Sequence, residues 1–217
     1  MLSLIIAEAA LELVPKELQN HRSVINHSKR LNRKPSEILL DRSYHHHAML
    51  RLKDRWKRGR PDLVHISLLA VTSTPLYREG LIDLYLHTIT DKVLYFKNVR
   101  LPRAYNRFEG LIIDLFKKKS IKNDDMFMEV KDMDLVSLLN YIKPNYVVGL
   151  SRLGKPSSAE EVSKKEGAII VGGFPRGHFS NIITSNIDEL VSISRYALDT
   201  HVVCSRIIYE FEKRLIR

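Results

Sequence analysis

Residues 134–173, DLVSLLNYIKPNYVVGLSRLGKPSSAEEVSKKEGAIIVGG, alternate between helical and extended patterns. In chain order, the pattern from here to the end gives a helix (134–142), a strand (145–151), a helix (157–167), two strands (168–173 and 188–194) and a closing helix (198–216). Strands that alternate with helices predict an α/β fold built on a mostly parallel sheet.

The first half of the chain continues the sheet and adds polar helices. Its pattern predicts a buried strand (2–10), polar helical material interrupted at Pro35, a helix that begins near Pro61, a hairpin (81–88 and 93–96) and a helix from about Pro102 to Lys119. Asp62 then lies in the first turn of the helix that begins near Pro61.

Three loops follow strands of the predicted sheet: residues 150–154, 172–179 and 193–198. Ligands of such sheets bind beyond the carboxyl ends of the strands, so we expect these loops to form a site. The glycines of VGGFPRGHF (171–179) let the backbone approach a ligand closely. This loop lacks both the phosphate-binding Gly-Lys-Ser/Thr ending and the GxGxxG pattern, which argues against a nucleoside triphosphate or dinucleotide. A tight turn without a ligand is the alternative.

The chain is strongly basic, and the excess charge is local. It has 35 Lys and Arg against 25 Asp and Glu, a net charge of +10. Twelve basic and three acidic residues between Arg22 and Arg60 give +9, and seven basic and two acidic residues between Arg100 and Lys122 give +5. A local basic surface of this strength is typical of nucleic-acid binders. A solubilising surface is the alternative, and an anionic membrane is disfavoured because no basic amphipathic helix with a bulky apolar face stands out.

Composition argues against several other classes. Hydrophobic residues make up 44% of the 217 residues, as in ordinary globular domains. No apolar run is long enough to cross a bilayer, and Glu8 and Glu12 interrupt the apolar N-terminal stretch, which disfavours a signal peptide. The single cysteine, Cys204, can form neither an internal disulfide nor a Cys-based zinc site, so we expect it to be a core residue in a reducing compartment.

Three arginines are candidates for RNA contacts. Arg103 and Arg107 share an exposed face if their helix begins near Pro102, and Arg100 lies just outside it. Guanidinium groups bind phosphates and stack on bases, which single-stranded RNA exposes. A solvated helix face is the alternative.

Metal and hydrolase sites are not indicated. His45, His46 and His47 are consecutive and cannot all face one metal ion from a regular helix. A surface or RNA-contacting run is therefore favoured, and no metal ligand is assigned. No GxSxG motif is present, so no catalytic triad is assigned either.

Five ordered motifs resemble those of one family. RPDLVHISLL (60–69), VRLPRAYNRFEGLI (99–112), VGLSRLG (148–154), VGGFPRG (171–177) and ISRYAL (193–198) are similar to motifs of the archaeal and eukaryotic ribosome-biogenesis pseudouridine N1-methyltransferases. The similarity runs from about Leu2 to Leu215. It implies a fold of the SPOUT class, in which a mostly parallel α/β sheet ends in a C-terminal trefoil knot, here with basic RNA-binding additions in the N-terminal half. General connection rules disfavour knots, so the knot follows from the resemblance alone.

The resemblance also implies an activity and its residues. The chain is expected to transfer a methyl group from S-adenosylmethionine to N1 of a pseudouridine in small-subunit ribosomal RNA, with a role in small-subunit biogenesis. The family's cofactor-binding positions match Leu150, Ser151, Gly172, Gly177, Ile193, Ser194, Arg195, Tyr196, Ala197 and Leu198. Its RNA-binding arginines match Arg60, Arg100, Arg103 and Arg107, and Asp62 matches an acidic residue that orients Arg60. This chain departs from the family at Gly173, where relatives often have Ala, and at Ala197, where many have Pro.

Asp62 is also a weak candidate for a general base. Pairing with Arg60 would lower its basicity, which favours the orienting role. A carboxylate in the first turn of a helix is well placed to orient a neighbouring guanidinium.

The resemblance extends to organisation and partners. It implies a single domain over 1–217, with RNA-binding elements within about 20–122 and a cofactor-binding knot region over about 145–217. It implies a homodimer that binds small-subunit rRNA and no membrane, with other ribosome assembly factors as candidate partners. A cytoplasmic location is expected, with an archaeal source favoured by the lack of long polar tails; a eukaryotic member would be nucleolar. The alternative function is a non-catalytic RNA-binding assembly factor, and a basic nuclease is disfavoured because no spaced set of carboxylates suits its chemistry.

Overall fold

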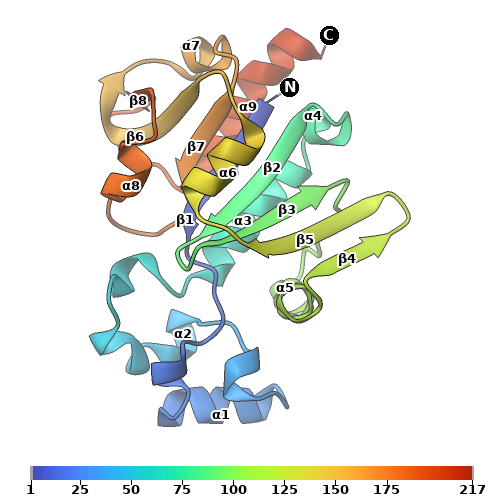
Figure 1. The fold of residues 1–217 in the computed structure, drawn as a ribbon, viewed down its shortest axis with the longest axis vertical. Helices are drawn as coiled ribbons and strands as arrows, with labels where there is room; N and C mark the ends of the chain where they lie inside the picture. Colours follow the sequence, from blue (N-terminus) through green and yellow to red (C-terminus); the bar gives the residue numbers. More distant parts are fainter. Residues whose placement is uncertain (1, 217) are drawn as a thin grey trace.

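A twisted sheet forms the centre of the computed structural model, which describes residues 2–216 (Figure 1). Its eight strands are β1 (Leu2–Ala9), β2 (Ile82–Thr88), β3 (Lys92–Lys97), β4 (Ser120–Asn123), β5 (Met126–Asp132), β6 (Val147–Pro156), β7 (Ala168–Gly172) and β8 (Glu189–Ser192). They lie in the order β4-β5-β3-β2-β1-β7-β6-β8. Five neighbouring strands run parallel to one another: β2, β1, β7, β6 and β8. Beyond β2, strands β3, β5 and β4 extend the sheet through antiparallel pairs. The predicted mostly parallel α/β fold is confirmed.

Helices cover both faces of this sheet. They are α1 (Arg22–Arg30), α2 (Arg42–His45), α3 (Pro61–Thr72), α4 (Pro75–Arg78), α5 (Tyr105–Lys118), α6 (Leu135–Ile142), α7 (Ala159–Ser163), α8 (Asn181–Thr184) and α9 (Thr200–Leu215). Four short 3₁₀ helices are η1 (Lys16–Leu18), η2 (Pro35–Glu37), η3 (Ala48–Arg51) and η4 (Arg55–Lys57). No helix within residues 2–216 is long and apolar enough to cross a membrane.

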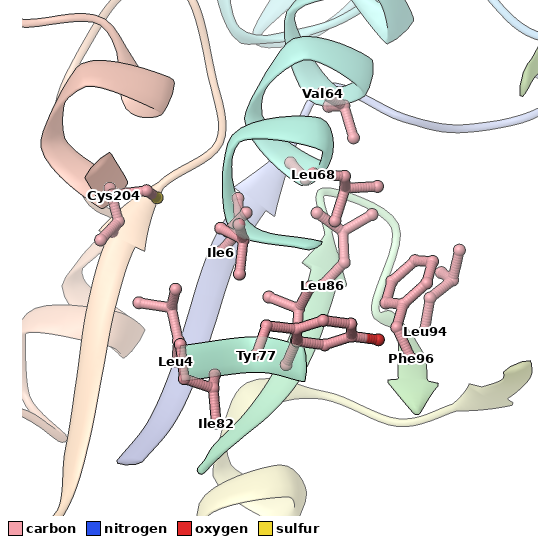
Figure 2. Packing of buried hydrophobic residues seen from close by; sticks show 14 of the residues in the cluster. Leu4, Ile6, Val64, Leu68, Tyr77, Ile82, Leu86, Leu94, Phe96 and Cys204 are labelled. Carbon is pink, nitrogen blue, oxygen red and sulfur yellow. The ribbon is translucent and has the colours of Figure 1, made fainter. Parts of the chain in front are cut away.

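Strand β1 is buried on both faces, which explains its continuous apolar sequence. Ile6 belongs to the larger core cluster, in which Val64 and Leu68 of α3 pack with Leu86 of β2 (Figure 2). Ile5 points to the opposite face, into a cluster that α6 completes. Successive side chains of one strand therefore join the two layers of helices.

Cys204 is a core residue, as predicted. It is fully buried on α9 in the larger cluster (Figure 2), and burial raises the pKa of its thiol to about 12. A thiol in this state is a small hydrophobic side chain rather than a nucleophile.

Helix α5 begins later than predicted. It starts at Tyr105, after an extended Ala104, instead of near Pro102. Nε2 of His65, on α3, lies 2.7 Å from the carbonyl oxygen of Pro102. This contact holds Pro102 outside the helix. Arg103 therefore precedes the helix, and the predicted helical face shared by Arg103 and Arg107 is wrong.

Strand β6 extends beyond its predicted end. It runs to Pro156, and both Leu150 and Lys155 pair with Val191 of β8. Residues 151–154 therefore form an irregular stretch inside β6. The sequence had predicted that they form a loop after the strand.

Residues 14–59, which we call the basic lobe, form a separate small body at one end of the sheet (Figure 1). The lobe has its own core, in which Val24, Ile38 and Met49 are buried. His45 lies inside this core, and its Nε2 is 3.0 Å from Nδ1 of His27. Burial lowers the pKa of His45 to about 4. The predicted surface run of histidines is therefore wrong for His45, which the lobe needs as a neutral core side chain.

Two ion pairs attach the lobe to the end of β1. Glu12 is almost completely buried and accepts two hydrogen bonds from Arg58, of 2.6 Å from Nε and 2.5 Å from Nη2. Burial works against the charge on Arg58, but hydrogen bonding and attraction to Glu12 outweigh it and raise the pKa of the guanidinium. Lys57 donates to Glu8 at 2.7 Å in an equally sheltered pair.

We expect Glu12→Gln to destabilise the protein strongly. It leaves the Arg58 cation buried without its partner, a loss of about 3–5 kcal/mol that lowers the unfolding midpoint by about 10 °C. Thermal unfolding followed by circular dichroism measures this shift. Glu161→Gln, which breaks the exposed pair with Lys164, is the control and should leave the midpoint nearly unchanged. Equal midpoints for Glu12→Gln and the parent protein would contradict this role.

Candidate functional site

A cavity of about 390 Å³ lies at the carboxyl ends of β6, β7 and β8. Its size is within the range of small-molecule sites. Nine of the ten sequence-predicted cofactor residues line it: Leu150, Ser151, Gly172, Gly177, Ile193, Ser194, Tyr196, Ala197 and Leu198. The three segments that were predicted to meet at this edge of the sheet therefore do meet.

Arg195 is the exception. It does not line the cavity, and its guanidinium lies 4.8 Å from the centre of the Tyr196 ring.

Six further lining residues lie inside the three predicted loops: Arg152, Phe174, Pro175, Arg176, His178 and Phe179. Seven others were not predicted from the sequence: Leu63, Val171, Val191, Ser192, Asp199, Thr200 and Val203. Most of these seven flank the predicted loops, so wider loop boundaries would have included them. Leu63 comes from α3, and no local pattern connects it with the loops.

A hydrogen bond joins two walls of the cavity. The hydroxyl of Thr200, at the start of α9, donates to the carbonyl oxygen of Gly172 at 2.6 Å. The loop after β8 is ordered within itself, since the Tyr196 N–H donates to Oγ of Ser194 at 3.1 Å. Both contacts fix backbone groups before any ligand binds.

Two glycines of the segment after β7 have specific steric roles. A Cβ on Gly173 would lie 2.8 Å from Cα of Ala9, so an alanine at this position would need a shift of β1. Gly177 has φ +106°, a conformation that L residues rarely adopt, and a Cβ there would lie 3.3 Å from Cε of Lys57.

The basic lobe contacts this segment through one buried lysine. Nζ of Lys57 lies 4.5 Å from the centre of the Phe174 ring and donates to Glu8. The other carboxylate oxygen of Glu8 accepts from the Ser180 N–H at 3.3 Å. Glu8 has φ +49°, a left-handed conformation that is costly for a non-glycine residue and here aims its carboxylate at both partners.

Arg60 and Asp62 form the pair that the sequence predicted. Nε and Nη2 of Arg60 donate to the two carboxylate oxygens of Asp62 at 2.8 and 2.9 Å. These bonds are the main reason that the pKa of Arg60 is raised, and the charge of Asp199 on the cavity wall adds to it. Burial favours the neutral form of Asp62, but the bonds from Arg60 prevail and hold its pKa below the usual range. The carboxylate is therefore a weak base.

The three arginines of residues 100–107 are exposed. No salt bridge engages Arg100, Arg103 or Arg107 within the described chain. The segment itself is fixed, because His65 holds Pro102 and the hydroxyl of Tyr105 donates to Asp41 of the lobe at 3.1 Å. Tyr105 is therefore an anchor rather than a free stacking surface.

The site combines a small-molecule cavity with a cationic border. No group of three or more His, Cys, Asp or Glu side chains within residues 2–216 is arranged to hold a metal ion. Asp199 and His178 are titratable groups on the cavity wall. The arrangement suits the binding of one small ligand in the cavity beside an anionic polymer.

Comparisons with known proteins agree with these features. The chain is 41% identical to the ribosomal RNA small subunit methyltransferase Nep1 of Thermococcus sibiricus, over 100% of both chains. It is 42% identical to the Nep1 of Staphylothermus marinus, covering 95% of this chain and 93% of that one. The crystal structure of Archaeoglobus fulgidus Nep1 bound to S-adenosylhomocysteine matches with a TM-score of 0.88 and 32% identity, over 97% of each chain.

The family model described as EMG1/NEP1 methyltransferase matches residues 4–212. This match includes all of the cavity wall and the whole sheet except the first two residues of β1. The chain therefore belongs to the EMG1/NEP1 methyltransferase family.

Proposed function

We propose that this protein transfers a methyl group from S-adenosylmethionine to N1 of a pseudouridine in small-subunit ribosomal RNA. The observation that carries the proposal is the cavity formed by three strand-end segments in a chain of this family, beside unpaired arginines. The relatives are named as small-subunit rRNA methyltransferases, and the related structure holds S-adenosylhomocysteine, the demethylated form of the donor. Both facts support the same reaction here.

The residues present fit the methyl donor. Gly172 and Gly177 keep the wall open to backbone contact, and Leu150, Ile193 and Leu198 supply apolar surface for an adenosyl group. S-adenosylmethionine would supply an electrophilic methyl group in this cavity. We propose the nine predicted residues that line the cavity as its binding site. Arg195 would stabilise the segment of residues 193–198 from outside the cavity.

The chain has to make the nitrogen of the substrate reactive. N1 of pseudouridine carries an imide-like proton and is a poor nucleophile until that proton is lost. Arg60 is held in a fixed orientation by Asp62 at the start of the helix that supplies Leu63 to the cavity wall, and its charge would stabilise negative charge that develops on the ring. Holding the base against the methyl group would lower the barrier further, since positioning supplies several kcal/mol in such reactions.

Asp62 serves this reaction by orienting Arg60. Its lowered pKa makes it a poor proton acceptor, and both of its oxygens are engaged. The mechanism therefore uses Asp62 as a positioning residue, with direct displacement at the methyl group and no covalent enzyme intermediate.

RNA would bind along Arg60, Arg100, Arg103 and Arg107, within elements between residues 20 and 122. The cofactor region would lie between 145 and 217, within one functional unit. We further propose a homodimer and a C-terminal trefoil knot, which the resemblance to this family implies. The complete cavity favours catalysis over the alternative of an assembly factor without activity.

We expect Gly177→Ala to weaken binding of S-adenosylhomocysteine by about tenfold or more, because the added Cβ strains the cavity wall at φ +106°. Isothermal titration calorimetry measures the affinity. Gly80→Ala is the matched control: Gly80 also has positive φ (+70°), but no atom lies within 4 Å of a Cβ there. It should bind the ligand as the parent protein does. Unchanged affinity in Gly177→Ala would overturn the assignment of this segment.

We expect Arg103→Ala to weaken RNA binding at every salt concentration and to reduce the slope of log K against log salt by about 0.7 to 1, the effect of one lost phosphate contact. Fluorescence anisotropy with a labelled single-stranded RNA measures both quantities.

Arg78→Ala is the control for charge alone, since Arg78 is an exposed cation of α4, at the amino end of β2. It should leave the slope unchanged. An Arg103→Ala slope equal to that of Arg78→Ala would remove Arg103 from the RNA surface.

A further inference from the structure

A second hollow lies between the basic lobe and the segment after β7. It measures about 350 Å³ and is lined by Arg42, His46, Met49, Leu50, Arg55, Trp56 and Arg176. We call it the Trp56 groove. None of these seven side chains is acidic, although three are cationic.

Trp56 presents an aromatic face to this groove. Its side chain is 48% exposed, which is unusual for a large hydrophobic residue that could pack inward. Its backbone is fixed, because the next residue, Lys57, is buried against Glu8 and Phe174. An exposed indole on a fixed backbone is a suitable surface for stacking a nucleic-acid base.

The arginines of the groove are ordered but keep free donors. Nη2 of Arg42 donates to the carbonyl oxygen of Arg55 at 2.7 Å, and Nη1 of Arg55 donates to that of Leu50 at 2.8 Å. Arg42 Nε is buried without a partner among the described residues. No carboxylate in residues 2–216 forms a salt bridge with Arg42, Arg55 or Arg176.

The groove adjoins the cavity, because Arg176 lines both of them. A Cβ on Gly177, a cavity residue, would lie 3.5 Å from Cδ1 of Trp56. An RNA strand whose target base meets the methyl donor at this cavity would therefore have a neighbouring nucleotide within reach of Trp56.

We propose that the Trp56 groove binds one unstacked nucleotide of the RNA strand, next to the nucleotide that is methylated. The base stacks on Trp56, and Arg42, Arg55 and Arg176 surround the phosphate. This proposal rests on the proposed RNA substrate. Charge and an exposed aromatic favour a nucleotide over an acidic peptide, because stacking uses the indole face and single-stranded RNA offers both a base and a phosphate at every unit.

The single tryptophan of the chain makes the groove directly observable. The probe is a single-stranded RNA decamer that contains one pseudouridine and carries a terminal fluorescein. We expect the decamer to quench Trp56 fluorescence, with saturation at the same RNA concentration as the anisotropy of the fluorescein. Trp56→Ala should weaken decamer binding on the order of 5- to 150-fold, the effect of one lost base stack, and Trp56→Phe should retain most of the affinity.

Tyr141→Ala is the matched control, because Tyr141 is a more exposed aromatic (66%) on α6 and lies outside the groove. It should bind the decamer as the parent protein does. The unfolding midpoints of all variants are compared to exclude a folding defect.

Each alternative gives a different result. Decamer binding by anisotropy with unchanged Trp56 fluorescence, and with equal affinity in Trp56→Ala, would overturn the groove and leave the proposed function in place. Absence of decamer binding at low salt would overturn both. Quenching by a polyglutamate peptide but not by RNA would assign the groove to an acidic protein partner and overturn this proposal.

Discussion

Two carboxylates that follow the apolar part of β1 hold the functional parts of this molecule together. Glu12 binds Arg58, and Glu8 binds both Lys57 and the backbone of Ser180. Arg58 and Lys57, which lie 46 and 49 residues from their carboxylates in sequence, are thereby fixed at the carboxyl edge of the sheet. Together with the hydrogen bond from Tyr105 to Asp41, these buried pairs hold the basic lobe beside the cavity.

This attachment makes the cavity and the cationic surface one site. Lys57 contacts Phe174 on the cavity side. Of its two neighbours in sequence, Trp56 lines the Trp56 groove and Arg58 forms the ion pair with Glu12. His65 and Tyr105 fix the arginine segment in the same way from the other side, through Pro102 and Asp41. Buried polar contacts between distant segments thus determine where an RNA strand would enter relative to a bound cofactor.

Local patterns predicted the sheet and much of the cavity. The alternation of residues 134–216 is a property of each segment, and the carboxyl ends of parallel strands necessarily meet at one edge. This is why Leu150, Gly172 and Leu198 were predicted together and do line one cavity. Arg195 was included with its neighbours because a sequence motif does not show which of its side chains face the cavity.

Features that depend on distant contacts were not predicted. The late start of α5 depends on His65, which is 37 residues from Pro102. The hairpin of β4 and β5 was missed because Ser120–Asn123 is mostly polar and lies at the sheet edge, where burial does not impose alternation. The interruption of the N-terminal apolar stretch by Glu8 and Glu12 was visible, but their cationic partners were not, since no local spacing connects them.

Methyl transfer to a defined base tests the central claim most directly. The purified protein and S-adenosylmethionine are incubated with two small-subunit RNA fragments that differ only in pseudouridine or uridine at one position, and nuclease fragments are weighed by mass spectrometry. The account predicts that the pseudouridine fragment gains the mass of one methylene group at that nucleotide, while the uridine fragment gains none, because uridine has no N1–H. Equal methylation of both fragments would contradict N1 specificity, and absence of methylation in a protein that binds both S-adenosylhomocysteine and the RNA would contradict the enzymatic function.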